Sequence, residues 1–324
     1  MIIDIHNHMY PQPYVEALQA EPSAYRISFD DHGNPILHSP GDYNILVPSH
    51  RLAEIRQQVV VQAGLTKQVV TLTAPGTTIE PPARSVRLSQ LINDAFAQIQ
   101  HDHSDRLAAL ATLPLNDPAA ALLELERAVK QLGLKGAMIF SNANGTPLSD
   151  QRFWPLYEKA HELKAILHLH PTFPVGVEAM QDFMLMPLVG FLADTTLAVS
   201  GLIYSGVIER FPGIRWILSH LGGAVLYLAE RLDRGYEAFQ QCRAHINRPP
   251  SEYLKTFYYD TVNFDPQAIQ FAIDFAGVDH LLAGSDYPHQ IGSIDKMIAS
   301  INALKIDQTA KAAILGGNAA RLFG

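Results

Sequence analysis

Short runs of β-branched and other apolar residues alternate along the chain with longer segments of helical periodicity. Such short runs, bounded by turn residues, are typical of strands buried in a sheet. The pattern predicts eight strands. The first contains Ile2, Ile3 and Ile5, and the other seven are expected at 68–73, 107–113, 134–140, 165–169, 214–218, 257–260 and 280–283.

Helices are predicted between these strands. Asp117 and Asp150 are expected N-caps, the first with Pro118 at the first helical position, where a missing N–H costs nothing. Two helices are expected to close the chain after the last strand. The others are predicted over 51–63, 83–102, 118–132, 151–163, 183–210 (two helices), 223–241 and 265–275.

Eight strands interleaved with helices are the pattern of a TIM-type (β/α)8 barrel, an α/β fold that reaches this length as one domain, here residues 1–324. A doubly wound open sheet is the alternative architecture. No Gly-x-Gly-x-x-Gly follows the first strand, so dinucleotide binding has no support. Residues 10–50 are rich in proline, glycine and histidine without clear periodicity. We expect them to form an insertion, or lid, over the barrel mouth.

Composition narrows the function classes. The chain has 324 residues, 48% of them hydrophobic and 17% charged, with a net charge of −8. Lysine and arginine form no cluster, so nucleic acid is not an expected partner, and an anionic substrate needs a local cation. The apolar stretch at 184–208 is broken by Pro187, Asp194, Ser200 and Ser205, which favours buried helices over membrane spans.

Cysteine usage and the first residues bear on the compartment. Cys242 is the one cysteine, so no intrachain disulfide can form, which fits a reducing environment. The first residues carry neither a basic stretch nor a long apolar run, so we expect no signal peptide. A cytoplasmic enzyme is the expectation.

Polar residues with metal-binding side chains follow several of the predicted strands. His6 and His8 are two residues apart in a strand, so their side chains share a face. The active site of such a barrel lies at the carboxyl ends of the strands, and three later strands end at His170, His220 and Asp286. Because converging histidine and aspartate side chains mark a metal site, the sequence predicts one divalent ion here.

Neighbouring residues are expected to support this site. His168 lies one pleat below His170, and Asp4 lies below His6, where it would orient the imidazole. His289 is expected to cover the site. Lys135 begins a strand at the opposite end, which argues against a lysine-bridged pair of metals.

Four motifs resemble the amidohydrolase superfamily: Asp-Ile-His-Asn-His, Leu-His-Pro at 169–171, Leu-Ser-His-Leu-Gly-Gly at 218–223 and Gly-Ser-Asp-Tyr-Pro-His at 284–289. They are most similar to the branch of 2-amino-3-carboxymuconate-6-semialdehyde decarboxylase and related non-oxidative aromatic-acid decarboxylases. The resemblance implies one divalent metal, typically zinc with manganese as the alternative. Its implied ligands are His6, His8, His170 and Asp286.

The same resemblance implies further roles. His220 would transfer the proton, with Asp286 as the second catalytic candidate, and Arg231 would bind substrate. His289, from its position over the site, is the other substrate-binding candidate. Arg231 would reach a substrate carboxylate in its own or a neighbouring subunit's site, whereas its charged neighbours Glu230, Asp233 and Arg234 also allow a solvated helix face. The stretch 42–46 lacks the substrate-binding arginine of the muconate-semialdehyde enzyme, and Arg51 does not align with it. This departure favours a different carboxylated ring or another small acid.

The leading hypothesis is therefore oxygen-independent decarboxylation of a small aromatic or muconate-type acid. The resemblance also implies that the protein is a homodimer. Hydrolysis of an amide, lactone or ester, or hydration of a small acid, by an activated water is the alternative. A purely structural metal ranks last, because such sites are closed and often cysteine-rich.

Overall fold

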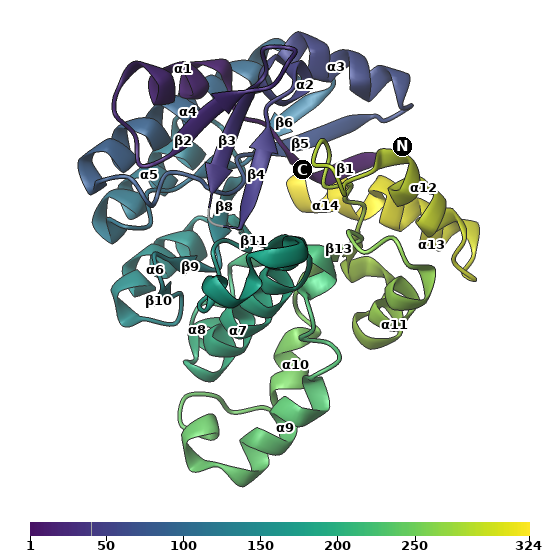
Figure 1. The fold of residues 1–324 in the computed structure, drawn as a ribbon. Coiled ribbons are helices and arrows are strands. Elements are labelled where there is room, and N and C mark those ends of the chain that lie inside the picture. Colours follow the sequence, from purple (N-terminus) through teal and green to yellow (C-terminus); the bar gives the residue numbers. More distant parts are fainter. Residues whose placement is uncertain (40) are drawn as a thin grey trace.

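Parallel strands form the centre of the computed structural model, which describes residues 1–39 and 41–324 (Figure 1). All eight predicted strands are present, and the third is split at Leu110. One sheet contains, in order, β1 (Ile3–His8), β5 (Lys67–Thr71) and β6 (Leu107–Ala109). The second contains, in order, β14 (Leu281–Leu282), β13 (Tyr258–Asp260), β12 (Arg215–Leu218), β11 (Ile166–His170), β8 (Gly136–Phe140) and β7 (Ala111–Thr112).

Main-chain bonds also occur where the two sheets meet. Ile5 N in β1 donates to Ala283 O, just after β14 (2.9 Å), and Leu110 N, between β6 and β7, donates to Val70 O in β5 (3.1 Å). The α/β class with parallel sheets is confirmed, and closure into one barrel stays a prediction at this point. All carboxyl ends of such strands point the same way, so the side chains that follow them meet at one face.

The helices follow the predicted alternation. Asp117 accepts a hydrogen bond from Ala120 N (3.1 Å), and Asp150 accepts one from Arg152 N (2.9 Å) at the start of the turn η1 (Gln151–Phe153), as the N-cap predictions require. The helices are α1 (Gln12–Ala20), α2 (Pro48–Arg51), α3 (Ala53–Gln62), α4 (Pro82–Asp102), α5 (Pro118–Lys130), α6 (Trp154–Glu162), α7 (Phe191–Tyr204), α8 (Val207–Arg210), α9 (Ala229–Ala238), α10 (Pro250–Leu254), α11 (Pro266–Ala276), α12 (Ile294–Asn302), α13 (Gln308–Ala312) and α14 (Asn318–Phe323).

One helix is shorter than predicted. The segment 223–241 was expected to be helical throughout, but only α9 is a regular helix there. Gly222 and Gly223 have φ angles of +77° and +65°, which a right-handed helix cannot contain. The chain therefore turns after β12 before α9 begins, and Cys242 lies beyond it in the short turn η6 (Gln240–Arg243).

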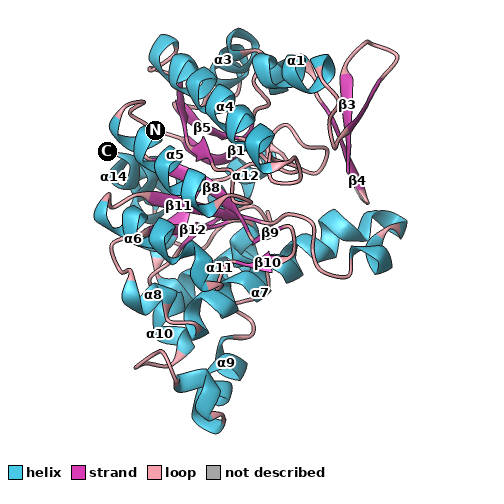
Figure 2. Cartoon of the chain, turned by 90° about the vertical axis from the view of Figure 1, so that its left-hand side faces the viewer, coloured by secondary structure: helices cyan, strands magenta, loops and turns pink. Residues whose placement is uncertain are grey.

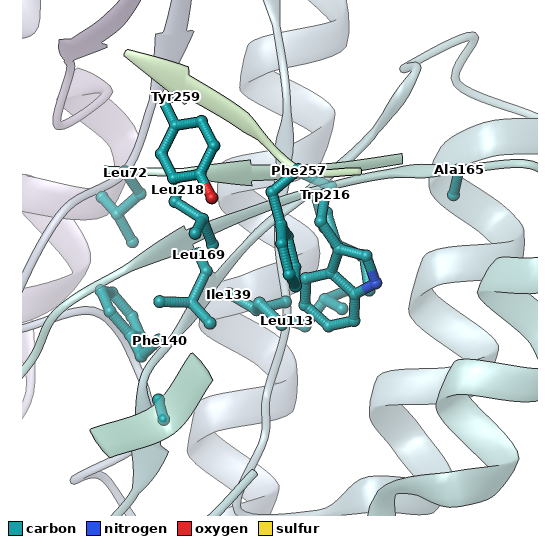
Figure 3. Packing of buried hydrophobic residues seen from close by; sticks show 14 of the residues in the cluster. Leu72, Leu113, Ile139, Phe140, Ala165, Leu169, Trp216, Leu218, Phe257 and Tyr259 are labelled. Carbon is teal, nitrogen blue, oxygen red and sulfur yellow. The ribbon is translucent and has the colours of Figure 1, made fainter. Parts of the chain in front are cut away.

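Apolar side chains from the strands pack against the surrounding helices (Figure 3). Trp216 and Phe257 lie with their ring centroids 6.5 Å apart in this layer. A smaller buried cluster includes residues from five strands, among them Ile5, Val69, Ile166, Ile217 and Leu282. Because its members come from both parallel sheets, this cluster gives the two sheets a common core.

The segment without clear periodicity, residues 10–50, contains regular structure in the part that is described. It contains α1 and an antiparallel sheet of β2 (Arg26–Phe29), β3 (Pro35–Ser39) and β4 (Asp42–Ile45), in the order β2-β3-β4. We call these three strands the lid sheet. Its strands are largely half-buried or exposed, so they lack the apolar alternation by which strands are detected. In Figure 2, β3 and β4 stand off from the parallel strands, on the side of β9 (Asn142–Ala143).

The apolar segment before β12 is only partly buried. By length and composition alone, residues 182–204 could span a membrane, with a mean hydropathy of 1.6. In this structure 33% of the most apolar stretch within them is buried. They comprise the turns η3 (Asp182–Met184) and η4 (Met186–Gly190) followed by α7. Leu188 and Val189 are exposed, so the prediction of buried helices holds for much of α7 and is wrong for the turns before it.

A buried arginine fixes the end of β1. Arg56 on α3 is fully buried, and its Nε donates to Ser49 O (2.8 Å) while its Nη1 donates to Asn7 Oδ1 (2.9 Å). Its Nη2 donates to the carbonyl oxygen of His8. Burial lowers the pKa of Arg56 to about 10, so the side chain stays charged at neutral pH. The guanidinium therefore joins the α2–α3 corner to the strand that ends at His6 and His8.

Replacing Arg56 by methionine is expected to lower the free energy of unfolding by about 3 kcal/mol, because buried acceptors then lose a charged donor. Urea denaturation measures the change. Arg87→Met is the control, since Arg87 is exposed and forms one ion pair with Glu21 over 3.6 Å. Equal denaturation midpoints for the two variants would contradict the role assigned to Arg56.

Candidate metal centre

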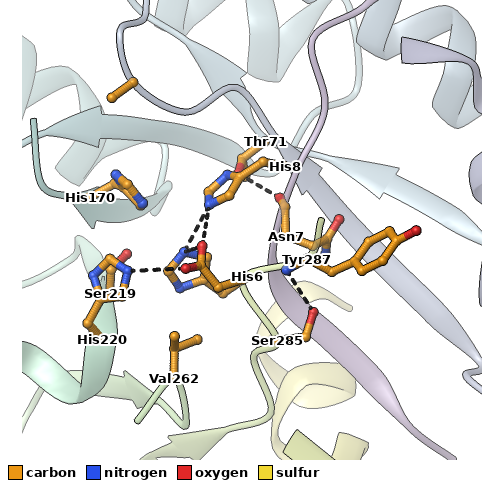
Figure 4. Close-up of polar contacts among 12 residues, drawn as sticks. His6, Asn7, His8, Thr71, His170, Ser219, His220, Val262, Ser285 and Tyr287 are labelled. Carbon is orange, nitrogen blue, oxygen red and sulfur yellow. Dashed lines mark hydrogen bonds and ion pairs between the residues drawn. The ribbon is translucent and has the colours of Figure 1, made fainter. Parts of the chain in front are cut away.

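Four imidazoles point toward a common centre at the ends of the parallel strands (Figure 4). His6 and His8 come from the end of β1, His170 ends β11, and His220 begins the turn after β12. All four are buried, and so is Asp286. The strand-end positions singled out in the sequence are therefore brought together.

The distances at the centre are short. His6 Nε2 lies 3.1 Å from His8 Nε2, and Asp286 Oδ1 lies 3.0 Å from His8 Nε2 and 3.4 Å from His6 Nε2. His220 Nε2 lies 3.9 Å from Asp286 Oδ2. Candidate ligand atoms of His6, His170, His220 and Asp286 all fall within 4.8 Å of one another.

Hydrogen bonds on the far side of the His8 and His170 rings fix their tautomers. His8 Nδ1 lies 3.1 Å from Thr71 Oγ1, and that hydroxyl donates to Asn7 O, so it must accept from the imidazole. His170 Nδ1 donates to Pro171 O over 2.7 Å. The proton of a neutral ring then resides on Nδ1, and the Nε2 lone pair faces the centre.

This arrangement fits a cation. The Nε2 atoms of His6, His8 and His170 and a carboxylate oxygen of Asp286 converge in a buried space, and within the described chain His170 Nε2 has no hydrogen-bond partner. Such a set is repulsive unless a positive charge lies between its members. Imidazole and carboxylate donors suit zinc and other first-row divalent ions.

The electrostatics of the ligands agree with this fit. Burial lowers the pKa of His8 and of His170 well below the usual range, so both are neutral near pH 7. Burial also opposes a charge on His6, but the Asp260 and Asp286 carboxylates outweigh it and raise its pKa to about 10. A divalent ion at the centre would displace that proton and be held by the same carboxylates.

Asp260 is a functional residue that sequence reasoning missed. Its carboxylate accepts a hydrogen bond from His6 Nδ1. It also accepts from the backbone N–H groups of His220 and Leu221, with N···O distances of 3.1 Å in both cases. His220 and Leu221 have φ angles of +54° and +55°, an unfavourable conformation for residues with side chains. One carboxylate therefore orients the His6 ring and holds the turn that presents His220. Its position at the end of the predicted seventh strand was the available signal.

Asp4 acts differently from the prediction. Its Oδ1 accepts from the backbone N–H of His6 (3.3 Å), and its Oδ2 accepts from Ser285 Oγ (2.6 Å) and Gln68 Nε2 (2.8 Å). The carboxylate thus fixes main chain near the site, whereas Asp260 orients the ring. His168 lies beneath the site as expected, with its Nε2 3.1 Å from Ser219 Oγ.

Close approach of strand ends requires a glycine at position 284. A Cβ added to Gly284 would lie 2.9 Å from His6 Cβ and 3.0 Å from Asp260 Cβ, closer than such atoms pack. The glycine thereby allows the eighth strand to pass directly against the His6–Asp260 pair.

A cavity of about 550 Å³ opens above the centre. Asp286 and His170 lie at its floor, His289 lines it, and the His289 ring centroid lies 4.8 Å from that of His8. Apolar side chains form much of its wall. These are Ile45, Val47, Phe183, Met184, Pro187, Leu188, Phe191, Pro288 and Ile291.

Arg231 is the predicted site residue that the fold does not bring to this cavity. It is exposed on α9, which both views place at the periphery of the molecule, away from β1 and β11 (Figures 1 and 2). It is not among the residues of the same chain that line the cavity.

A parallel α/β fold with a buried His/Asp centre beneath an apolar cavity defines an enzyme built to hold a metal ion at the strand ends. The chain belongs to the amidohydrolase family, whose sequence model matches residues 3–324.

Comparison with similar proteins narrows the class of enzyme. The chain is 30% identical to the 2-amino-3-carboxymuconate-6-semialdehyde decarboxylase of Dictyostelium discoideum, over 99% of this chain and 91% of that protein. It is 27% identical to the 6-methylsalicylic acid decarboxylase of Penicillium expansum, over 99% and 95% of the two chains. The crystal structure of 5-carboxyvanillate decarboxylase LigW from Sphingomonas paucimobilis superimposes with a TM-score of 0.87 at 26% identity, over 99% and 98%. These findings confirm the predicted family, an enzyme whose relatives are carboxy-lyases.

Asp260→Asn is expected to weaken binding of a divalent metal by about 10- to 100-fold, because the amide cannot fix His6 as the carboxylate does. Titration of the metal-free protein with zinc, and separately with manganese, measures the change. Asp274→Asn, at an exposed position on α11, is the matched control. Unchanged affinity in Asp260→Asn would show that His6 needs no such partner.

Proposed function

We propose that this protein is a metal-dependent, non-oxidative decarboxylase of a small aromatic carboxylic acid. The observation that carries the proposal is the convergence of imidazole Nε2 atoms on the Asp286 carboxylate, which with His170 lines an apolar cavity. The ligands are His6, His8, His170 and Asp286, and the ion is zinc, with manganese as the alternative. The carboxylic-acid decarboxylases among the relatives support the reaction class.

The proposal includes one closed (β/α)8 barrel formed by residues 1–324. The bonds from Ile5 N to Ala283 O and from His8 N to Tyr287 O (2.8 Å) support closure on one side, and the bond between Leu110 and Val70 supports it on the other. Closure would place all strand ends around one mouth, with the lid sheet across it. We also propose a cytoplasmic location, which the single cysteine favours.

A bound divalent ion would hold a substrate oxygen beside the scissile carboxylate and stabilise the negative charge that develops there. His220 is positioned to move the proton, since its Nε2 faces the centre and its Nδ1 has no partner within the described chain. The ring carbon that bears the carboxylate accepts that proton. The electron pair of the breaking carbon–carbon bond then restores the ring, and CO2 leaves.

The cavity walls supply the other requirements of this reaction. Phe191 and Leu188 offer an apolar surface to an aromatic ring, and the same surface excludes water. His289, next to His8, is placed to contact the substrate. Decarboxylation needs no water as a reactant, whereas hydrolysis does, so a water-poor wall favours the lyase over the hydrolase alternative.

We further propose a homodimer. The exposed apolar side chains before β12 support it: Phe183 is 86% exposed and Leu197 64% exposed, and nearby Tyr227 is 83% exposed. Arg231 follows Tyr227 by four residues, so a second copy seated on this face would carry its own Arg231 near the opposite cavity. Such an arginine would supply the guanidinium that a substrate carboxylate binds in a forked geometry.

The reaction is tested by incubating the metal-loaded protein, without oxygen, with a panel of hydroxybenzoates and muconate-type acids. We expect CO2 release from at least one aromatic acid, and loss of that release when a chelator removes the metal. Turnover of esters, lactones or amides, without CO2 release from any acid, would contradict this proposal and show that the protein is a hydrolase.

The roles of His6 and His220 can be separated by metal analysis. His6→Ala is expected to lose both metal and turnover. His220→Ala is expected to keep the metal and to lose turnover by about 100-fold or more, the usual contribution of a proton-transfer group. Loss of metal in both variants would make His220 a ligand.

Mixing two inactive variants tests the role of Arg231 across subunits. Arg231→Ala lacks the arginine and His6→Ala lacks the metal, but a mixed dimer contains one site with both. If dimers re-form at random, about a quarter of the wild-type activity is expected from a one-to-one mixture. No gain over the separate variants would place Arg231 outside the partner's site.

A further inference from the structure

The charges around the cavity are unusual for a site that receives an acid. Among the residues that line it, in the described ranges 1–39 and 41–324, none is lysine or arginine. Three are aspartates: Asp286 at the metal centre, and Asp30 and Asp42 on the lid side. A substrate that enters therefore meets acceptors on the wall opposite the metal.

The two aspartates of the lid side differ in their surroundings. Asp30 is occupied within its own turn, where it accepts from the backbone of His32 (2.9 Å) and Asn34 (2.7 Å) and from Asn34 Nδ2 (2.9 Å). Asp42 accepts from the backbone N–H of Tyr43 through Oδ1 (2.8 Å), and no described residue donates to its Oδ2. Asp42 is thus the carboxylate available to a ligand.

Packing holds Asp42 in the cavity wall. Gly41, the residue before it, lies against the apolar segment, because a Cβ added to Gly41 would lie 3.1 Å from Met186 Cβ. That segment also supplies Phe183 and Leu188 to the same cavity. Burial raises the pKa of Asp42 to about 6, and repulsion from Asp286 adds to the rise, as expected for two carboxylates that share one cavity.

We propose that Asp42 selects the substrate: it accepts a hydrogen bond from a hydroxyl or amino group on the ring edge away from the metal, and it repels a second carboxylate there. The inference rests on the proposed function for the orientation of the acid. It names the preferred class as monocarboxylic aromatic acids that carry a donor substituent. A site built to accept a hydrogen bond discriminates strongly against ligands that lack the donor, and like charges discriminate against a second anion.

Binding to the metal-loaded protein tests the inference apart from turnover. Calorimetric titration would compare three classes of probe: benzoate, its meta- and para-hydroxy derivatives, and the corresponding benzene dicarboxylates. The proteins are wild type, Asp42→Asn, Asp42→Ala and the control Asp31→Asn, which alters an exposed lid residue outside the cavity lining. Metal content and melting temperature establish that each variant is folded and loaded.

For Asp42→Ala we expect about tenfold weaker binding of one hydroxybenzoate, as for a lost hydrogen bond to a charged acceptor, and unchanged binding of benzoate. For Asp42→Asn we expect at least tenfold tighter binding of a dicarboxylate. The control should resemble wild type. Equal effects on all three classes of probe, or no effect on any, would overturn the assignment.

The outcomes for reaction and selection are separable. If the binding pattern follows Asp42 but no acid releases CO2, the decarboxylase proposal fails and the selective role of Asp42 stands. If CO2 is released and the preference among acids is the same in wild type and both Asp42 variants, the reaction stands and the inference about Asp42 fails.

Discussion

The convergence of ring nitrogens and a carboxylate oxygen in a buried space at the ends of the strands is the constraint on which the rest of the molecule depends. His6 Nε2 and His8 Nε2 are 3.1 Å apart, with a carboxylate oxygen of Asp286 3.0 Å from the second. Bringing such groups together in a buried space is unfavourable by itself, so surrounding interactions must hold them. The bonds that Asp260 makes to His6 and to the turn at His220, and the bonds that Arg56 makes at the end of β1, do so.

These supports also explain why the backbone is unusual here. His220 and Asp286 both have φ angles near +55°, outside the range that residues with side chains prefer. Backbone N–H groups of Ser285 and Asp286 donate to His6 O, over 3.1 and 2.8 Å, and thereby fix the second of these turns against the first strand. The local free-energy cost is met by hydrogen bonds that reach between distant parts of the chain, which is typical of functional sites.

The parallel strands and most of the candidate metal ligands could be predicted from the sequence, because apolar runs that end in histidine or aspartate mark both the strand and its functional end. Asp260 also ends a strand, but its partner His6 is 254 residues away, and nothing local separates it from an ordinary turn aspartate. Arg56 has the same difficulty, since an arginine in a helix is usually solvated. The strands of the lid sheet were not predicted because they are too exposed to show alternating apolar and polar residues. The turn after β12 was not predicted because it depends on two glycines within a stretch that otherwise has helical periodicity.

The lid sheet has its own hydrogen-bond ladder: among the described strands, β2, β3 and β4 pair only with one another. Its sequence can therefore change without altering the register of any parallel strand, and the groups that hold the ion would be untouched. The stretch that faces the acid and the stretches that perform the chemistry are thus free to diverge at different rates. A duplicated gene could therefore reshape one wall of the cavity through the lid sheet, which offers a physical reason for one scaffold to serve a series of different carboxylates.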